Sequence, residues 1–561
     1  MGSWTQKQVE WRQVRPFVVY GVAPALLAAA LFKALLLTQQ YGYDIADSGA
    51  YDVIAWKLSR GWHLYRDLQT MYMPGLHWLE AVVFRLFHPD AYWGKAIGPL
   101  TLIPVSVLLY FMTLRWAHPI LAVGAGLYLG AIGPGYYPGH VWLLAGVLLL
   151  AAPAATGSAR GRLALGAVFS LALLNKLEVG IVGCAGGLAG LAALWWMRRE
   201  RAGPRLWPML WPALAGMAAL PLLWVLWLAA RGDLPDAYYC LVRMPLGWGR
   251  VLARQPWPGV LGPGGLPLIS RVMDASHGWD FYAGLALCPA VAALVAVRLR
   301  RGTARLNDAL IAALAVAGGL LLVLSMTEKD TYHLHSARIP MLPLEALVVA
   351  LSVGWLRGRR NLAPGVLGLA FVASVWAWRL TSYANYLVFP LIVGIPDADA
   401  PVRLANWRPA RVEALEGLKL PPEEAARYEQ LVAYLDANLR PGERFFEMPG
   451  APGLYFLSRR DPPTRFLWFN PGMVDQAGER RIIRDLERHR VRLVVFDKPP
   501  DQPYLRGVSA RQDTPVLVGW ILEHYRLRGA IGGCQIYWRR SAAGGGTRTQ
   551  EAAPGRRIGT R

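Results

Sequence analysis

The chain has 561 residues, of which 54% are hydrophobic and 17% charged, and its formal net charge is +22. A charge of this size can indicate nucleic acid binding. Here, however, the basic residues lie in short segments between hydrophobic blocks, where membrane insertion and contact with anionic lipid headgroups account for them. The four cysteines are far apart, with neither metal-ligand spacing nor a disulfide framework. The composition therefore predicts a protein embedded among membrane lipids, with no nucleic acid partner.

Hydrophobic blocks of membrane-spanning length recur before the composition changes near residue 395. Crossing the hydrocarbon core takes roughly 20 apolar residues, and about eleven such blocks can be counted. Their approximate centres are Ala28, Val105, Val123, Val147, Val168, Gly187, Met217, Leu287, Ala315, Val348 and Phe371. Residues 1–395 are therefore predicted to form an α-helical polytopic membrane domain with about eleven transmembrane helices.

Basic residues set the predicted orientation in the membrane. They gather in four short segments, at residues 7–15, 198–205, 298–305 and 357–360. With an odd number of spans these segments share one side, which the positive-inside rule makes the cytoplasm. The prediction is a multi-pass protein of the inner (plasma) membrane with a cytoplasmic N-terminus. The first loop (residues 39–92), a long loop at 231–280 and everything after residue 395 are then extracytoplasmic.

The C-terminal part of the chain has the pattern of a small folded domain. Residues 396–540 are polar and alternate helix-like with strand-like segments. The helix-like segments are Glu423–Leu439 and Glu479–Arg490, and the strand-like ones are Val491–Phe496 and Gln535–Trp538. This alternation predicts an extracytoplasmic α/β domain. Residues 541–561 are rich in Gly, Thr, Ala and Arg and predict a disordered tail.

Acidic residues close to the bilayer distinguish the first loop. Asp44 and Asp47 follow the first hydrophobic block, and acids in such a place are functional-site candidates by default. Helical spacing at Ala50–Leu58 is followed by an apolar segment at Trp78–Phe87, too short for a span, which predicts an interfacial helix anchored by its aromatic residues. The alternative is a solvated loop in which Asp47 merely caps the helix that follows.

A second candidate site lies between the ninth and tenth predicted spans. Its polar residues are Lys329, Asp330, His333, His335 and Arg338. A His-x-His pair alone is a weak zinc signal. The cations suit an anion better, phosphate above all, because guanidinium and ammonium groups form strong charge-assisted hydrogen bonds with it. The alternative is ordinary anchoring of two helix ends at the interface.

A third candidate is the junction between the fifth and sixth predicted spans, which contains Lys176 and Glu178. Charged groups this close to hydrocarbon are expected to have a partner. Either they contact a ligand, or they pair with each other while Lys176 extends its charged end toward water.

These segments together resemble the polytopic GT-C glycosyltransferases. They are most similar to the bacterial group of protein mannosyltransferases and aminoarabinose transferases, which use polyprenyl-phosphate sugars. The family's Asp-x-x-x-Tyr motif, Gly-x-x-x-Tyr-Arg-Asp stretch and proline-containing turn read here as Asp47–Tyr51, Gly61–Asp67 and Pro74-Gly75. Lys329-Asp330-x-x-His333 and Asn175–Gly180 are also similar. The chain departs from many relatives at Ser48, where they carry Glu, and at Met73, where they carry Lys.

The resemblance implies transfer of a hexosyl or pentosyl group from a polyprenyl-phosphate sugar to an extracytoplasmic acceptor that it does not identify. It implies Asp47 as the general base, with Asp44 next. It places at the donor phosphate Lys329, His333, Arg338, Lys176 and Arg66, and around the substrates Tyr51, Tyr65, Asp67, Tyr72, Glu178, Asp330 and His335. Such chemistry needs a base for the acceptor hydroxyl and cations for the departing phosphate. No cofactor is required, and a divalent metal is optional because the leaving group is already activated.

Two other functional classes fit a polytopic membrane chain. One is a transporter or flippase for a lipid-linked or amphipathic solute, and the other is a non-catalytic envelope scaffold. A transporter is expected to place polar groups near the bilayer midplane along a path. This sequence instead gathers its acids and cations near the predicted outer ends of the spans.

Overall fold

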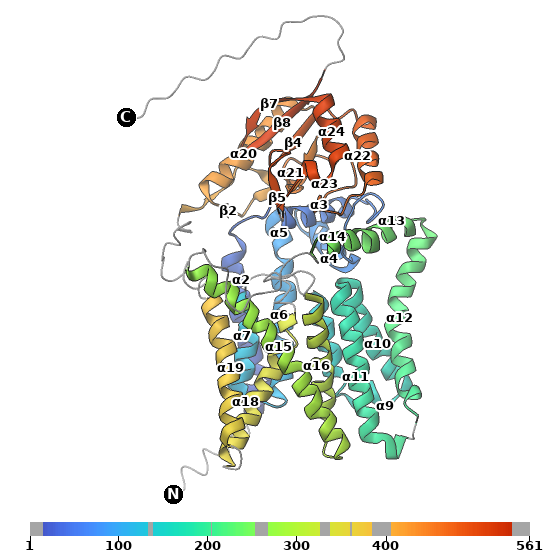
Figure 1. Cartoon of the computed structure of the whole chain (residues 1–561), viewed down its shortest axis with the longest axis vertical. Coiled ribbons are helices and arrows are strands. Elements are labelled where there is room, and N and C mark those ends of the chain that lie inside the picture. Colours follow the sequence, from blue (N-terminus) through green and yellow to red (C-terminus); the bar gives the residue numbers. More distant parts are fainter. Residues whose placement is uncertain are drawn as a thin grey trace, which may run out of the picture.

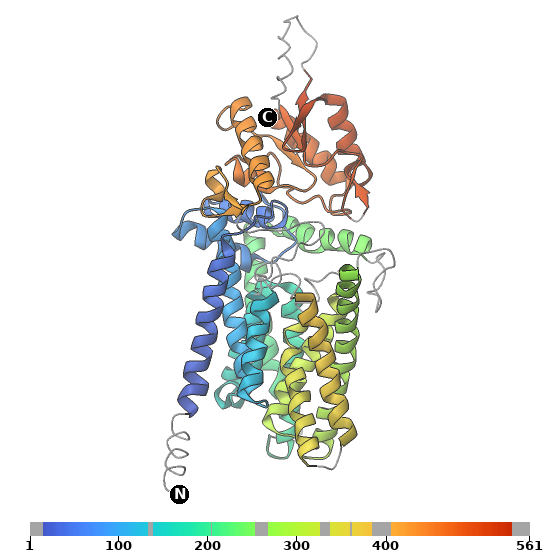
Figure 2. The ribbon, with the colours of Figure 1, turned by 90° about the vertical axis from the view of Figure 1, so that its left-hand side faces the viewer.

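The computed structural model describes residues 15–132, 138–202, 205–252, 268–325, 337–358, 362–383, 406–505 and 507–540. Long helices stand side by side in a bundle, and the C-terminal segments form a separate layer at one end of it (Figure 1). A view from a quarter turn away places this layer beyond the same helix ends (Figure 2). We call it the cap, residues 406–540.

Each predicted hydrophobic centre lies within a helix of the bundle. The helices are α2 (Ala23–Gln39), α6 (Ile97–Leu114), α7 (Pro119–Ile132), α8 (Pro138–Leu149), α10 (Ala159–Asn175), α11 (Leu177–Ala202), α12 (Trp207–Ala230), α15 (Leu268–Arg300), α16 (Leu306–Ser325), α18 (Leu342–Arg357) and α19 (Leu362–Tyr383). Among the described residues, six helices are long and apolar enough to cross a membrane, and three shorter helices are also apolar. These helices confirm the prediction of an integral membrane protein with several membrane-spanning helices.

Small residues allow the bundle helices to approach closely. A Cβ atom added at Gly166 of α10 would collide with the carbonyl oxygen of Ala213 in α12, and one at Gly216 of α12 would collide with that of Leu163. Because lipid tails are as apolar as leucine, helices in a membrane associate through such close backbone packing. The polar ends of the bundle are therefore held at fixed positions.

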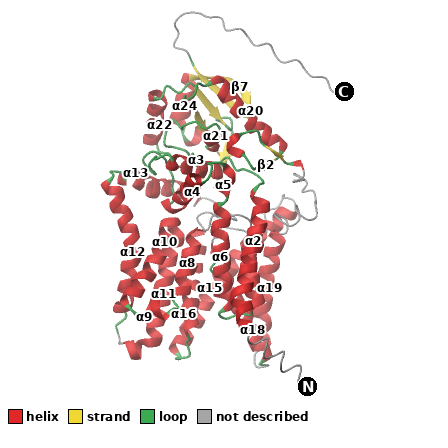
Figure 3. Ribbon diagram, turned by 180° about the vertical axis from the view of Figure 1, so that it is seen from behind, coloured by secondary structure: helices red, strands yellow, loops and turns green. Residues whose placement is uncertain are grey.

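The cap is a small mixed α/β unit, as predicted. Its main sheet has the strand order β3 (Phe446–Met448), β4 (Leu493–Phe496), β8 (Cys534–Arg539), β7 (Tyr525–Ile531). Strands β3 and β4 are parallel and the other two pairings are antiparallel. Minor strands are β1 (Arg408–Pro409), β2 (Lys419–Leu420), β5 (Pro503–Leu505) and β6 (Val508–Ser509), and the helices are α20 (Pro422–Asn438), α21 (Gly453–Leu457), α22 (Gln476–Arg488), α23 (Ala510–Asp513) and α24 (Pro515–His524). Among the described residues, strands appear only at this end of the molecule (Figure 3).

Short helices lie between the bundle and the cap (Figure 1). The first loop contributes α3 (Asp47–Ser59), α4 (Pro74–Leu86) and α5 (Ala91–Lys95), and a later segment contributes α13 (Leu234–Tyr238), a π-helical turn (Tyr239–Arg243) and α14 (Met244–Leu252). The long segment between spans predicted at 231–280 is largely helical in its described residues, 231–252 and 268–280. One hydrophobic core joins these helices to the cap through buried residues of each, including Trp56, Cys240 and Phe456.

The prediction of an interfacial helix at Trp78–Phe87 is only partly correct. Helix α4 occupies this segment, and Trp78 and Phe87 are exposed, as lipid-anchoring residues should be. Phe84 is instead buried and stacks on Phe456 of the cap, with ring centroids 5.8 Å apart. One side of α4 therefore packs on protein, a partner that local periodicity could not identify, while Trp78, Val82 and Leu86 form an exposed apolar stripe.

Candidate functional site

The acidic residues of the first loop lie where the chain enters α3. The carboxylate of Asp44 accepts hydrogen bonds from the backbone N–H groups of Ala46, at 2.9 Å, and Asp47, at 3.2 Å. Asp44 therefore supports the start of the helix. The capping role that the sequence suggested for Asp47 is filled by Asp44. Asp47 is the first residue of α3, and its side chain is exposed. The helix N-terminus favours a negative charge at this position.

Two of the predicted substrate tyrosines meet in an aromatic cluster. The ring of Tyr51 lies 5.5 Å from that of Tyr72, 5.4 Å from His77 and 5.9 Å from Trp468 of the cap. His77 is fully buried, and its Nε2 is 3.1 Å from the hydroxyl of Thr70. Burial lowers the pKa of His77 to about 3, so its ring is neutral. Neither His77 nor Trp468 was predicted, because no sequence signal pairs them with the tyrosines.

The junction between α10 and α11 lies against the start of α4. A Cβ atom at Gly75 would come within 2.6 Å of the side-chain oxygen of Asn175, so Gly75 is needed for the contact. Beside it, Lys176 Nζ lies 3.3 Å from Glu178 Oε1. The predicted mutual pairing is thus present. This lysine stands close to the turn in which Met73 replaces the lysine of many relatives.

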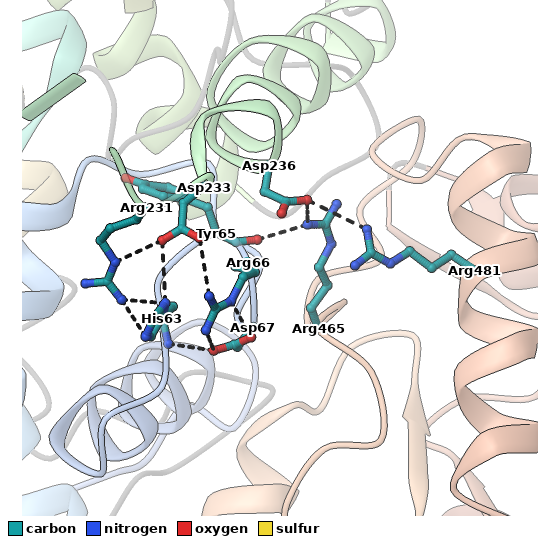
Figure 4. Close-up of polar contacts among 9 residues, drawn as sticks. All are labelled: His63, Tyr65, Arg66, Asp67, Arg231, Asp233, Asp236, Arg465 and Arg481. Atoms are coloured by element: carbon teal, nitrogen blue, oxygen red, sulfur yellow. Dashed lines mark hydrogen bonds and ion pairs between the residues drawn. The ribbon is translucent and has the colours of Figure 1, made fainter. Parts of the chain in front are cut away.

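A polar network ties the first loop to the segment after α12 (Figure 4). Asp67 accepts hydrogen bonds from the backbone of His63, at 2.9 Å, and from Arg66 Nε, at 3.1 Å. Asp233, whose side chain is 1% exposed, lies 3.6 Å from Arg66 and 3.3 Å from Arg231. Arg66 and Asp67, predicted at the donor phosphate and the substrate, are therefore held in this network.

The cap enters the same network through Arg465 (Figure 4). Arg465 Nη1 donates to the backbone oxygen of Tyr65, at 3.0 Å, and to the carboxylate of Asp236 in α13. Tyr65 is buried at a positive φ of 71°, and its hydroxyl donates to the backbone oxygen of Tyr72 at 3.0 Å. Tyr65 thus fixes the course of the loop that carries Tyr72.

A buried carboxyl pair was missed. Asp52 of α3 and Glu80 of α4 are 3% and 1% exposed, and their carboxyl groups approach the same point, since a Cβ atom at Gly94 would lie 2.2 Å from Asp52 Oδ1 and 3.3 Å from Glu80 Oε1. Burial raises the pKa of Asp52 to about 7, and burial together with the neighbouring Asp52 raises that of Glu80 well above its usual value. The pair depends on three separate helices meeting, which spacing along the chain does not reveal.

Some predicted site residues lie outside the described residues. They are Lys329, Asp330, His333 and His335. The predicted boundary between the membrane domain and the C-terminal domain, at residues 395 and 396, and the predicted disordered tail at 541–561 also lie outside the described residues. Arg338 is described and is 2% exposed, just before α18. In the described ranges, no group of three or more His, Cys, Asp or Glu side chains is placed to hold a metal ion.

No family model matches the chain, and no curated protein matches it. Among solved structures, it is similar to an Archaeoglobus fulgidus oligosaccharyltransferase tethered with an acceptor peptide, at 13% identity and a TM-score of 0.47, over 87% of this chain and 69% of that one. It is also similar to ArnT from Cupriavidus metallidurans bound to undecaprenyl phosphate, at 14% identity and a TM-score of 0.43, over 93% and 99%. Likeness at these scores carries no conclusion about family or activity.

Proposed function

We propose that this protein is a membrane glycosyltransferase that moves a sugar from a polyprenyl-phosphate donor to an extracytoplasmic acceptor. The observation that supports it best is the convergence of motif residues at the cap end of the bundle. Tyr51, from one motif segment, and Tyr72, two residues before the Pro74-Gly75 turn of another, lie in one aromatic cluster. The Lys176–Glu178 junction, from a third, lies against the turn that follows Tyr72.

Asp47 suits the role of general base. Its carboxylate is exposed at the first turn of α3, one helical turn before Tyr51, so an acceptor hydroxyl approaching the aromatic cluster could reach it. A base must come within hydrogen-bond reach of the proton it removes. The buried Asp52 is a poorer candidate, because Glu80 and the backbone of Gly94 already enclose it.

The donor phosphate needs cations at the end of the bundle beside the cap. Lys176 is described there and Arg338 is described just before α18, whereas Lys329 and His333 lie outside the described residues. Cations arranged in advance in a lipid-lined, low-dielectric site stabilise the charge that grows on the departing phosphate. The lipid tail of the donor explains why such an enzyme is built on membrane helices.

The arrangement of charge favours an enzyme over a transporter. In the described part of the bundle, the ion pairs Lys176–Glu178 and Arg298–Asp308 lie at helix ends rather than along a midplane path. A transporter is expected to line its pathway with polar groups near the bilayer centre.

The test is transfer by purified protein in nanodiscs, with a panel of polyprenyl-phosphate sugars, hexosyl and pentosyl, and a panel of envelope acceptors. We expect release of polyprenyl phosphate and a glycosylated product with at least one pair. A parallel assay follows movement of a labelled lipid-linked sugar across proteoliposome membranes. Donor movement without transfer on any acceptor would favour the flippase and contradict the proposal.

A further inference from the structure

A basic cavity lies between the first loop and the cap. Its volume is about 350 Å³, and Gly61, Trp62 and the Pro462-Pro463 turn form part of its wall. The arginines that line it are Arg66, Arg444, Arg465, Arg481 and Arg488, and His489 lines it too. Two acidic side chains, Asp67 and Asp485, also line it, so arginines outnumber acids in the lining of the cavity.

A second basic cavity of about 970 Å³ adjoins the first on the surface of the cap. The two share Arg444 and His489 in their linings and are therefore neighbours, and the two together are here called the basic groove. The second cavity adds Arg440, Arg490, Arg492 and Arg539, opposed by Glu443 and Glu487. Cations therefore line both cavities of the groove.

Arg66 and Arg465 of the groove are held closely by Asp67 and Asp236, but three other ion pairs in and around the groove are loose. The separations are 3.4 Å for Arg492–Glu443, 3.7 Å for Arg481–Asp236 and 3.8 Å for Arg488–Asp485. Elsewhere on the cap, Arg408 binds both oxygens of Glu429, at 2.6 and 2.8 Å. The contrast means that the guanidinium groups of Arg481, Arg488 and Arg492 keep donors for another partner.

Arg465 supplies a further donor at the inner wall. Its side chain is 6% exposed, and its Nε has no hydrogen-bond partner among the described residues. A buried donor without a partner costs free energy, so a ligand that accepts this bond would be favoured.

We propose that the basic groove binds a phosphate-rich anionic chain. The planar guanidinium group donates two parallel hydrogen bonds to phosphate, which makes arginine the preferred residue for such ligands. Two neighbouring cavities fit an extended chain better than one ion, and a concave groove fits a chain better than a flat membrane surface. A phosphorylated glycan and an inorganic polyphosphate share this chemistry. The binding does not depend on the proposed sugar transfer.

The experiment measures binding of a fluorescent short inorganic polyphosphate to the full-length protein in nanodiscs of zwitterionic lipid. The groove variant is Arg481→Ala with Arg488→Ala, both exposed residues of α22. The charge-matched control is Arg526→Ala with Arg528→Ala, on exposed positions of β7 outside the groove. Since each charge-assisted contact is worth a factor of roughly ten or more, we expect the groove variant to bind at least about tenfold more weakly.

The control should stay within about twofold of wild type, because screened charge at a distance contributes little. Equal losses in the two variants, or no binding by wild type, would overturn the proposal. A labelled polyglutamate of the same charge provides a second arm. If it bound as tightly as polyphosphate, the groove would recognise charge alone, and the assignment to phosphate would be wrong. Because binding rather than transfer is measured, this outcome is independent of the proposed enzyme activity.

Discussion

Helix α3 exposes an ionisable side chain in its first turn and buries two others further along. Asp47 in the first turn is exposed. Asp52 is 3% exposed, and the side chain of Lys57 is 0% exposed. The difference arises from the neighbours, because Gly49 lets α21 of the cap pack directly on α3, while α4 and α5 cover Asp52.

Burial acts on the two enclosed residues in opposite directions. It raises the pKa of Asp52 to about 7 and lowers that of Lys57 to about 8, because in each case the charged form loses hydration. Lys57 is partly compensated by an ion pair with Asp461 of the cap and by Trp56, whose ring centroid lies 3.4 Å from Nζ. One helix thus combines an accessible acid suited to chemistry with buried groups suited to holding the cap.

The largest effect is expected for Asp47→Asn. Loss of a general base typically lowers the rate by about 10²–10⁴-fold. Transfer should therefore collapse, while donor binding and the unfolding midpoint remain close to wild type, because the side chain is exposed. Turnover is measured with the donor and acceptor found in the panel. Near-wild-type activity would assign the general-base role to Asp44 or Asp52. The exposed acid of α3 would then have no part in transfer.

Next in size is the loss of stability for Asp461→Ala. Removing Asp461 leaves Lys57 buried with only the rings of Trp56 and Trp62 near its charge, at a cost of about 1–3 kcal/mol, below the range for fully buried pairs because the Asp461 side chain is 40% exposed. The matched variant is Lys57→Met, which removes the buried charge itself and should cost less. Unfolding in detergent at about pH 7 compares the two. If Lys57→Met were the more damaging, the buried ion pair would be a net stabiliser.

The pH dependence of the Asp461→Ala effect sharpens this test. Lys57 has a folded-state pKa of about 8, below its usual value of 10.5, and loss of Asp461 lowers it further. As the pH rises toward 8, Lys57 of the variant is already neutral while that of wild type loses its charge. The stability difference should therefore shrink between about pH 7 and pH 9. A constant difference would mean that Lys57 does not carry the effect.

Donor affinity is the third test, and it compares cations instead of acids. A charged contact to the donor phosphate is worth roughly 1.5–3 kcal/mol, so its loss should raise the apparent donor constant about tenfold or more. The variants are Lys329→Ala, His333→Ala and Lys176→Ala, titrated with the same donor. The sequence favours the first two. If they titrate like wild type while Lys176→Ala is impaired, the phosphate lies at the α10–α11 junction.

The last test is the pH dependence of stability caused by Asp52. Its pKa rises from 3.8 to about 7 on folding, so between these values the folded state holds a proton that the unfolded state has lost. Stability should therefore fall as the pH rises through this window, by up to about 1.4 kcal/mol per pH unit. Asp52→Asn should flatten the profile, whereas Asp47→Asn, the exposed control, should leave it unchanged. Identical slopes in all three proteins would contradict the buried pair.

Much of the architecture could be predicted from local pattern. Each hydrophobic centre lies in a bundle helix, and the pattern at Glu423–Leu439 is helix α20 within one residue at each end. Such features depend on residues close in sequence. Prediction from local pattern fails for helix α4, because its apolar residues predict burial but do not indicate whether lipid or protein covers them. Phe84 is covered by Phe456 of the cap.

The sequence by itself determined the membrane bundle, the α/β cap and the segments that hold the candidate residues, because hydrophobic length and periodicity act over one element at a time. Only the tertiary structure decided which acids are enclosed. Asp47 and Asp52 belong to the same short helix, and the contacts of Asp52 with Glu80 and Gly94 come from helices brought together by packing. The basic groove likewise joins arginines from the first loop and the cap, because packing places distant charges together regardless of their separation along the chain.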